Sequence, residues 1–370
     1  MVLKALFVVL IHLALVSGAA PGSTVSEKMQ SLHRWDSHWY SDIATRGYVS
    51  TVPPVPRGEE SNVTHFPGYP LMIRAVTVVT GATGKWPALI AAWLMAWALW
   101  FYVFALFQRW RVGALGQGLA SLLMMGFPTA FFSVAAYSES LFLAAILGFV
   151  FWAGRPGPLS FGVAAIHGVA ATATRIAAVV LAFAVPRVLN ALAMLGALAF
   201  FAYCQAKFGM WNIYLVRQDM GWGNKTTFSA LFSPSSYAPH FTHWLDYNEF
   251  GKGMNLVLLL VIIAIFGFLA LGMKRGRALH HEGLRLLSIA VGLFALLIVS
   301  LHATGYHLVA RYHYPIWFLL VLGATGVFSG KKTAGAPRPL LVAATAICAV
   351  AMIWLQCHFV RIFTEGGPVM

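Results

Sequence analysis

A carboxylate beside cationic side chains is the first candidate for chemistry in this sequence. It lies in residues 33–48, HRWDSHWYSDIATRGY, where Asp36 stands two positions from an arginine on one side and a histidine on the other. Cationic neighbours keep a carboxylate ionised, and an ionised carboxylate can accept a proton from a hydroxyl group. The alternative is an interfacial helix in which Trp35 and the other rings form an aromatic belt. That alternative explains the rings and leaves the acids, Asp42 included, without a role.

A second carboxylate, Glu139, follows an apolar run that has Tyr137 near its end. The apolar segment after it, residues 140–154, would form a helix of about 15 residues or ~22 Å, shorter than the ~30 Å hydrocarbon core of a bilayer. Glu139 is therefore expected below the membrane surface, where an acid is unfavourable and by default marks a functional site. The alternative is structural, with Ser138 capping a helix and Glu139 interacting with the helix dipole.

Two arginines are placed where they can bind a phosphate group. Arg175 falls inside the apolar residues 160–187, and Arg311 lies in the segment VARYHYP, residues 309–315. Arginine suits phosphate because its planar guanidinium donates paired hydrogen bonds. For Arg311 the alternative is snorkelling to lipid headgroups, an explanation that fits the deeper Arg175 less well.

Helices that cross a membrane must position these residues. Hydrophobic residues make up 59% of the 370 positions and charged residues 10%, and the mean hydropathy is +0.75. A water-soluble fold would lack the polar surface to cover itself, and the long apolar runs show no barrel-like alternation, so the sequence predicts an all-α polytopic membrane protein. Apolar segments are expected at 1–20, 86–107, 114–136, 140–154, 160–185, 188–206, 253–273, 286–301, 314–329 and 339–357.

Basic residues predict the orientation of this bundle. The net charge of +14 comes from Lys and Arg scattered through short loops, which indicates membrane orientation rather than nucleic-acid binding. The loops expected in the cytoplasm contain Arg109, Arg111, Arg155, Lys274, Arg275, Arg277, Arg285, Lys331, Lys332 and Arg338. All of these loops lie in the cytoplasm only if residues 160–187 cross the membrane twice, with a turn near Thr172 to Arg175. The bundle would then have about 10–11 transmembrane helices. Every acidic residue except Glu282 then lies on the non-cytoplasmic side.

The chain divides into five parts. Residues 1–20 are a first transmembrane helix or a signal peptide. Residues 21–85 are a large, proline-interrupted extracytoplasmic loop with the acidic motif, and residues 86–207 are the core of the bundle. Residues 208–252 form a second extracytoplasmic loop, and residues 253–370 supply the C-terminal transmembrane helices.

Several segments together resemble the PIG-V mannosyltransferase family, the second-mannose enzymes of GPI-anchor synthesis, and its prokaryotic relatives. They are RWDSHWY at 34–40 with the IA and GY pairs after it, HFPGYPL at 65–71, the FP to YSESLF stretch at 127–142, and ATR at 173–175. They cover roughly the first half of the chain in order, and the match at 311–315 is weaker. His38 departs from the family's pattern after the Trp-Asp pair.

The resemblance implies a GT-C glycosyltransferase fold and an inverting transfer of mannose from a polyprenyl- or dolichyl-phosphate donor to a glycan or glycolipid acceptor. Asp36 matches the family's loop carboxylate and is predicted to be catalytic. Substrate and donor are predicted to be bound by Trp35, Asp42, Tyr137, Glu139, Arg175 and Arg311. No metal or other cofactor is required, and a metal is not excluded. The expected location is the bacterial inner membrane, or the endoplasmic reticulum membrane in a eukaryote, with membrane lipids as partners.

Two other functions stay open from the sequence. One is a transporter or lipid flippase, because intramembrane Arg and Glu also mark substrate pathways, although no internal repeat is seen. The other is a GT-C enzyme with a different lipid-phosphate sugar, because arabinosyl and glucosyl groups present similar hydroxyls. A metal site has little support, since His240 and His243 form a lone pair.

Overall fold

The structure is a computed structural model that describes residues 1–50, 61–185, 187–238, 247–274, 280–306, 310–329 and 339–367. Within these residues the chain forms helices and turns and contains no β-strand. The predicted all-α fold class is therefore confirmed. The predictions that lie outside the described residues concern Arg275, Arg277, Lys331, Lys332, Arg338, His240 and His243.

The described elements are α-helices and short 3-10 helices. The α-helices are α1 (Val2–Ala19), α2 (Val25–Gln30), α3 (Asp36–Arg46), α4 (Gly68–Thr80), α5 (Trp86–Arg109), α6 (Ala114–Met125), α7 (Glu139–Ala153), α8 (Pro158–Thr174), α9 (Arg187–Ala193), α10 (Leu195–Phe208), α11 (Ile213–Trp222), α12 (Tyr247–Lys274), α13 (His281–Leu301), α14 (Ala310–Phe328) and α15 (Pro339–Glu365). The described 3-10 helices are η1 (Ala130–Ser133), η2 (Ile176–Phe183), η3 (Phe228–Phe232), η4 (Pro234–Ser236) and η5 (His302–Thr304).

Long apolar helices make this chain an integral membrane protein. Among the described residues, six segments are long and apolar enough to cross a membrane: Val2–Ala19, Trp86–Arg109, Val188–Phe208, Phe250–Leu271, His281–Thr304 and Val342–Glu365. Large apolar side chains such as Phe7 and Phe268 remain 64% exposed, which suits a surface that faces lipid tails. The shorter helices α6, α7 and α8 are also apolar.

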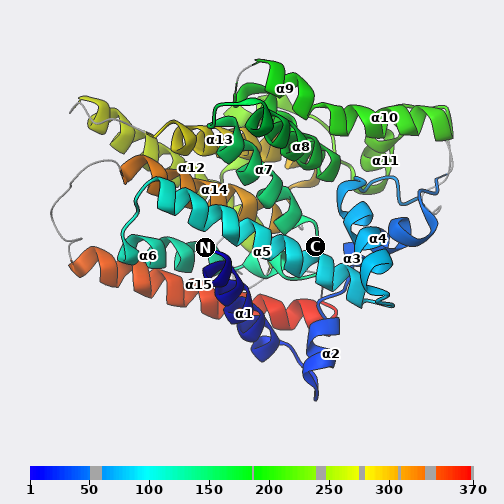
Figure 1. Ribbon diagram of the computed structural model, residues 1–370, viewed down its shortest axis with the longest axis horizontal. Helices are drawn as coiled ribbons and strands as arrows, with labels where there is room; N and C mark the ends of the chain where they lie inside the picture. Colours follow the sequence, from blue (N-terminus) through cyan, green and yellow to red (C-terminus); the bar gives the residue numbers. More distant parts are fainter. Residues whose placement is uncertain are drawn as a thin grey trace.

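Helix α7 lies at the centre of the bundle, between α5 and α8 (Figure 1). All its residues from Glu139 to Phe151 are buried, so α7 touches protein on every side. It approaches α8 closely at Gly148, where an added Cβ would lie 1.9 Å from the His167 ring. A side chain at this position would force the His167 ring to move, and that ring is held by hydrogen bonds with the Tyr102 hydroxyl and the Val163 carbonyl oxygen. The close packing holds the first turn of α7, and with it Glu139, in a fixed place.

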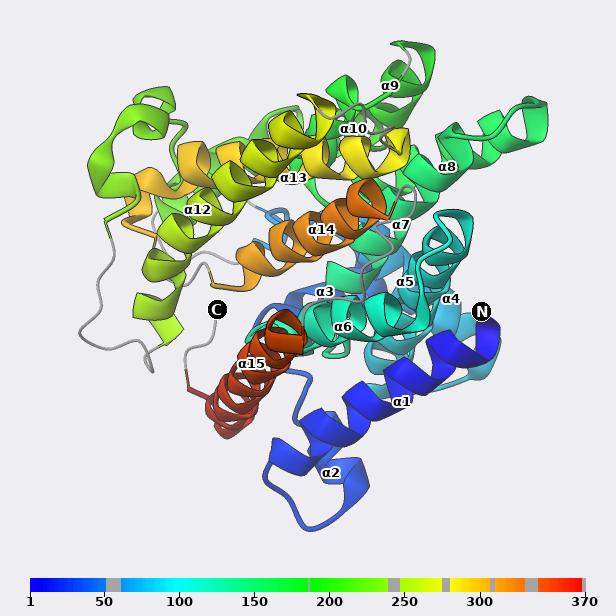
Figure 2. The same cartoon turned by 90° about the vertical axis from the view of Figure 1, so that its left-hand side faces the viewer.

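The remaining helices pack around this centre in two groups. Helices α12, α13 and α14 pack side by side, while α1 and α15 lie together along another flank (Figure 2). His12 of α1 forms a buried hydrogen bond with Gln356 of α15, with 3.2 Å between Nε2 and Oε1. The first helix therefore packs as a member of the bundle, against both α5 and α15.

Two apolar stretches differ from simple transmembrane helices. The segment expected at 114–136 is not one helix, because α6 ends at Met125 before Gly126 and Pro128, and only η1 follows. In the other stretch α8 ends at Thr174, close to the expected turn, and Arg175 has an extended backbone with φ −151° and ψ 138°. The 3-10 helix η2 then packs back on α8. Protein surrounds this break, since Thr172 and Thr174 are buried.

Candidate functional site: two linked ion pairs at the start of α3 and α7

Helix α3 begins at Asp36, so the carboxylate occupies its first turn. The residue before it, Trp35, has φ 53°, a left-handed backbone conformation that is uncommon for a bulky side chain. Contacts with the segment before α7 hold this turn in place, because the Tyr137 hydroxyl donates a 3.1 Å hydrogen bond to the Arg34 carbonyl oxygen. Backbone strain at a position fixed in this way is typical of functional sites.

Asp36 is buried and forms an ion pair with an arginine from the far end of the sequence. Its Oδ2 lies 2.6 Å from Nη2 of Arg311, at the start of α14, and 3.6 Å from Nε2 of His65. Burial on its own would raise the pKa of Asp36, but the positive charge of Arg311 and the contact with His65 outweigh it. They hold the pKa of this carboxyl well below its usual range, so Asp36 is ionised at neutral pH.

A second ion pair joins the start of α7 to the break after α8. Nη2 of Arg175 bonds to Oε1 of Glu139, and Nε of Arg175 donates a 3.0 Å hydrogen bond to Oγ of Ser138. The Glu139 side chain is fully buried. Arg175 reaches it because the extended backbone after Thr174 directs the chain away from the α8 axis. The break in the apolar stretch thus supplies the partner of a fully buried acid.

Aromatic side chains connect the two ion pairs into one cluster. The Arg311 guanidinium carbon lies 5.3 Å from the Tyr137 ring centre and 4.8 Å from the Tyr312 ring centre, and that of Arg175 lies 5.7 Å from the Tyr312 ring. Nη2 of Arg311 also donates a 2.8 Å hydrogen bond to the Tyr312 hydroxyl. Such cation–π contacts hold both guanidiniums in fixed orientations. We call the group of Asp36, Glu139, Arg175 and Arg311 the charged cluster.

The charged cluster has hydrogen-bonding capacity that the described residues do not use. Buried atoms without a hydrogen-bond partner in the described part of the chain include Oε2 of Glu139 and both Nε and Nη1 of Arg311. A buried polar atom left unsatisfied is unfavourable by about 1–3 kcal/mol, and more if it is charged. Free guanidinium N–H groups suit an anionic oxygen, and a free carboxylate oxygen suits a hydroxyl. The cluster can therefore bind a ligand that presents both groups.

Five of the seven site residues predicted from the sequence meet at one place. Asp36, Glu139, Arg175 and Arg311 form the charged cluster, and Tyr137 lies against it. Trp35 is adjacent to Asp36 and half-buried, and its Nε1 has no hydrogen-bond partner among the described residues.

Asp42 has different surroundings. It forms an i,i+4 ion pair with Arg46 and accepts a 2.7 Å hydrogen bond from Nδ2 of Asn62. Asn62 is completely buried and also donates to the Gly47 carbonyl oxygen. Asp42 thus connects α3 to the loop that follows it.

Sequence reasoning gave no functional role to two neighbours of Asp36. His65 contacts Asp36, and its ring packs edge-on against Tyr40 at 5.1 Å between ring centres. The Tyr40 hydroxyl in turn lies 3.2 Å from Oγ of Ser138, so it bridges α3 and α7. His65 was one histidine among several without metal-ligand spacing, although it opens the HFPGYPL segment of the resemblance. Burial raises the pKa of Tyr40 to about 12, so its hydroxyl stays protonated.

Comparisons with known proteins support the fold. No protein-family model matches the chain, and no curated protein matches it significantly. Among solved structures, the chain is similar to the crystal structure of ArnT from Cupriavidus metallidurans bound to undecaprenyl phosphate. The TM-score is 0.55 at 13% sequence identity, with 98% of this chain and 77% of the ArnT chain covered. ArnT has the GT-C fold, so the chain has a GT-C-type fold, as predicted.

Proposed function

We propose that this protein is a membrane glycosyltransferase that transfers mannose from a polyprenyl- or dolichyl-phosphate donor to an acceptor hydroxyl on the non-cytoplasmic face, with inversion. The charged cluster carries the proposal, because it joins an ionised carboxylate to arginine N–H groups that have no hydrogen-bond partner in the described part of the chain. The GT-C-type fold supports the same class of reaction, since the similar ArnT structure contains a polyprenyl phosphate. The likeness of residues 34–40 and 127–142 to PIG-V enzymes favours mannose as the sugar.

The two arginines of the cluster would bind the donor phosphate. Nε and Nη1 of Arg311 have no hydrogen-bond partner among the described residues, while Nη2 holds Asp36. A phosphate oxygen can therefore bind Arg311 without displacing the carboxylate. Arg175 lies 5.7 Å from the centre of the Tyr312 ring, which Arg311 also contacts, and adds a second positive charge. Together the guanidiniums would stabilise the negative charge that develops on the departing phosphate.

Asp36 would orient the acceptor and receive its proton. The acceptor oxygen attacks the anomeric carbon, the bond from that carbon to the phosphate oxygen breaks, and the lipid phosphate leaves with the electron pair. Its low pKa makes Asp36 a weak base. Because phosphate is a good leaving group, the acceptor hydroxyl has to lose its proton to Asp36 only late in the reaction. One displacement without a covalent sugar intermediate inverts the anomeric centre.

The remaining groups of the cluster would hold the sugar. Oε2 of Glu139 is a buried acceptor without a partner among the described residues, and a sugar hydroxyl can donate to it. The half-buried Trp35 would provide an apolar face against which a pyranose ring can pack. Mannose, glucose and arabinose present similar hydroxyls to these groups, so the sugar must be identified by assay.

The assay uses purified protein, a membrane extract as acceptor, and radiolabelled mannosyl, glucosyl and arabinosyl polyprenyl phosphates. Wild type should transfer label from the mannosyl lipid, and Asp36→Asn should lower the rate by about 10²–10⁴-fold, the usual contribution of a positioned acid or base. Asp219→Asn is a matched control, because it removes a half-exposed carboxylate of α11 that pairs with the exposed Lys225 and does not belong to the charged cluster. Transfer of glucose or arabinose instead would show that the donor carries that sugar and not mannose. No transfer from any of the lipids would refute the proposed activity.

A further inference from the structure

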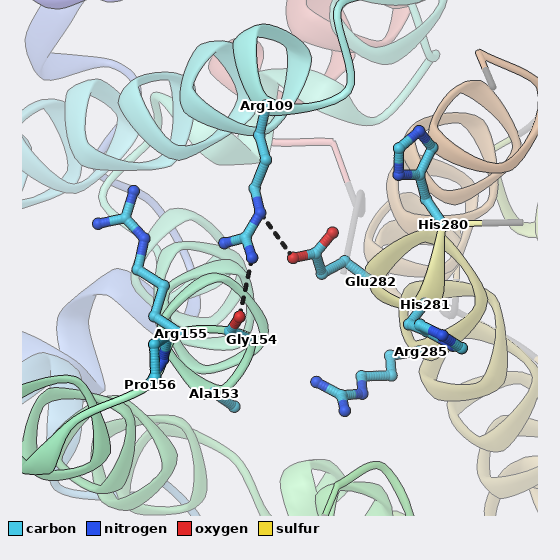
Figure 3. A pocket seen from close by; sticks show the side chains of 9 residues that line it. All are labelled: Arg109, Ala153, Gly154, Arg155, Pro156, His280, His281, Glu282 and Arg285. Atoms are coloured by element: carbon cyan, nitrogen blue, oxygen red, sulfur yellow. Dashed lines mark hydrogen bonds and ion pairs between the residues drawn. The ribbon is translucent and has the colours of Figure 1, made fainter. Parts of the chain in front are cut away.

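A second concentration of charge lies at the other end of α7, away from the charged cluster. A cavity of about 650 Å³ is formed where α5 and α7 end and α13 begins (Figure 3). None of the residues of the charged cluster lines it. Helix α7 runs from Glu139 in the cluster to Ala153 at the cavity, and its fourteen steps of ~1.5 Å place the two sites about 21 Å apart. The cavity is therefore separate from the proposed transfer site.

The carboxylate of Glu282 lines the cavity, and both of its oxygens already have partners. Oε1 of Glu282 lies 2.9 Å from Nε of Arg109, and Oε2 accepts a 3.0 Å hydrogen bond from the Trp110 indole. Nη2 of Arg109 also donates a 2.8 Å hydrogen bond to the Gly154 carbonyl oxygen, which ties α5 to the end of α7. Glu282 thus compensates the charge of Arg109 and has no oxygen without a partner.

Two further arginines line the cavity without a carboxylate partner among the described residues. They are Arg155, just after α7, and Arg285, in the first turns of α13. The guanidinium of Arg155 stacks over the Phe151 ring at 4.1 Å and over the Trp152 ring at 4.8 Å. Stacking occupies the face of a guanidinium and leaves its N–H edge free. Figure 3 shows the three arginine side chains extending from different helices around one hollow.

The charges around the cavity do not balance. Three arginines and one glutamate give a formal charge of +2, with histidines neutral. Helix α13 adds to this, because the side chain of its N-cap residue, His280, makes no capping hydrogen bond to the first N–H groups of the helix. Free N–H groups and the helix dipole make such an end favourable for anions. Membrane orientation needs basic residues near this surface, but it does not require three to converge on one cavity.

We propose that this cavity is a binding site for a phosphate-bearing anion, supplied by an anionic phospholipid headgroup or by a soluble phosphate compound. Arg155 and Arg285 would bind the phosphate oxygens, because guanidinium N–H groups and phosphate form strong, charge-assisted hydrogen bonds. The Arg109–Glu282 pair forms the fixed wall, and the first turn of α13 contributes backbone N–H groups. The ligand bridges α7 and α13, so it should also stabilise the fold.

The test uses full-length protein with two probes. Pyrophosphate is titrated against protein in phosphatidylcholine nanodiscs, and lipids retained from phosphatidylglycerol or phosphatidylcholine are counted by native mass spectrometry. Arg155→Gln and Arg285→Gln are compared with Arg111→Gln, which removes the same charge from an exposed arginine beside α5 that does not line the cavity. The melting temperature of each variant is measured without and with probe, because a ligand of the native state raises it.

Each cavity variant should weaken binding of the effective probe about tenfold, the usual loss for one charge-assisted contact of ~1.4 kcal/mol. Arg111→Gln should bind as wild type does. Retention of phosphatidylglycerol alone identifies a lipid headgroup, and binding of pyrophosphate identifies a soluble ligand. The proposal is overturned if neither probe binds, or if Arg111→Gln weakens binding as much as the cavity variants. If Arg285→Gln does not fold, Arg155→Gln and Arg285→Lys provide the same comparison.

Discussion

Helix α3 contains two aspartates, one at its first residue and one six residues later, and the two have very different surroundings. Asp36 is 8% exposed and pairs with Arg311 from another helix, whereas Asp42 is 25% exposed and pairs with Arg46 of its own helix. Six residues of an α-helix rotate the side-chain direction by about 600°, which leaves these two carboxylates about 120° apart. One face of α3 thus meets the charged cluster and another holds the following loop.

This contrast shows how a cluster of acids in one motif can divide its roles. Breaking the Asp36 pair leaves a buried arginine uncompensated, which is strongly destabilising in proteins. Breaking the Asp42–Arg46 pair affects a partly exposed contact, and such pairs contribute only about 0.3–0.5 kcal/mol. Substitutions at the two sites should therefore differ in effect by orders of magnitude.

The largest effect that sharpens this contrast should come from Arg311→Lys. Lysine keeps the positive charge beside Asp36 but lacks the planar guanidinium that donates from several N–H groups at once. We expect kcat/KM for the lipid-phosphate donor to fall about 10²-fold, the equivalent of two lost contacts of ~1.4 kcal/mol each. Initial rates at varied donor concentration measure it. An unchanged kcat/KM would remove Arg311 from the donor site.

A shift in pH dependence should follow from Arg311→Gln. In wild type the pKa of Asp36 is depressed, so its charge and its stabilising contribution are present above the ordinary value of 3.8 and are lost only as the pH falls through the lowered pKa. Without Arg311, burial dominates and raises this pKa. The acid limb of kcat/KM should then move upward relative to wild type, with about a tenfold loss per pH unit below the new pKa. An acid limb at the same pH in both proteins would contradict the account.

A smaller effect is expected from Glu139→Gln. Glutamine still accepts a hydrogen bond from Arg175 but removes the negative charge and replaces one acceptor oxygen with a donor amide. We expect kcat to fall about tenfold, corresponding to one lost hydrogen bond of ~1.4 kcal/mol to a sugar hydroxyl. Thermal unfolding measured in parallel separates this loss from misfolding. A rate equal to that of wild type would leave Glu139 with a structural role only.

The smallest effect should come from Asp42→Asn. The variant loses an i,i+4 ion pair of about 0.3–0.5 kcal/mol and keeps an acceptor for Asn62. Transfer rates should stay within about threefold of wild type, because less than 1 kcal/mol changes a rate by less than about fivefold. A loss comparable to that of Asp36→Asn would instead support the substrate-binding role that the sequence predicts for Asp42.

The fold was largely predictable because lipid restricts a chain to few architectures. An apolar composition requires helices, and the break near Arg175 followed from the basic loops on either side of it. The split between α6 and η1 was missed because residues 114–136 are mostly apolar and carry no charge, although Gly126 and Pro128 were available signals. Composition predicts whether a segment lies in lipid or in water, but it predicts poorly where a helix ends.

The sequence predicted which residues belong to the site, but not which of them form ion pairs with each other. Charge at membrane depth and the resemblance to PIG-V enzymes identified Asp36, Glu139, Arg175 and Arg311 separately. Their pairing depends on α14 meeting α3 across most of the sequence, a contact that no local pattern encodes. Asp42 could not be separated from Asp36 without knowing the phase of α3.

The most direct test of the central claim is label transfer from radiolabelled polyprenyl-phosphate mannose by wild type, Asp36→Asn and Asp42→Asn, prepared and assayed side by side. The account predicts that wild type and Asp42→Asn transfer label at similar rates, and that Asp36→Asn, although folded, transfers almost none. Equal rates for the two variants would contradict the claim that the buried carboxylate of α3 carries the reaction.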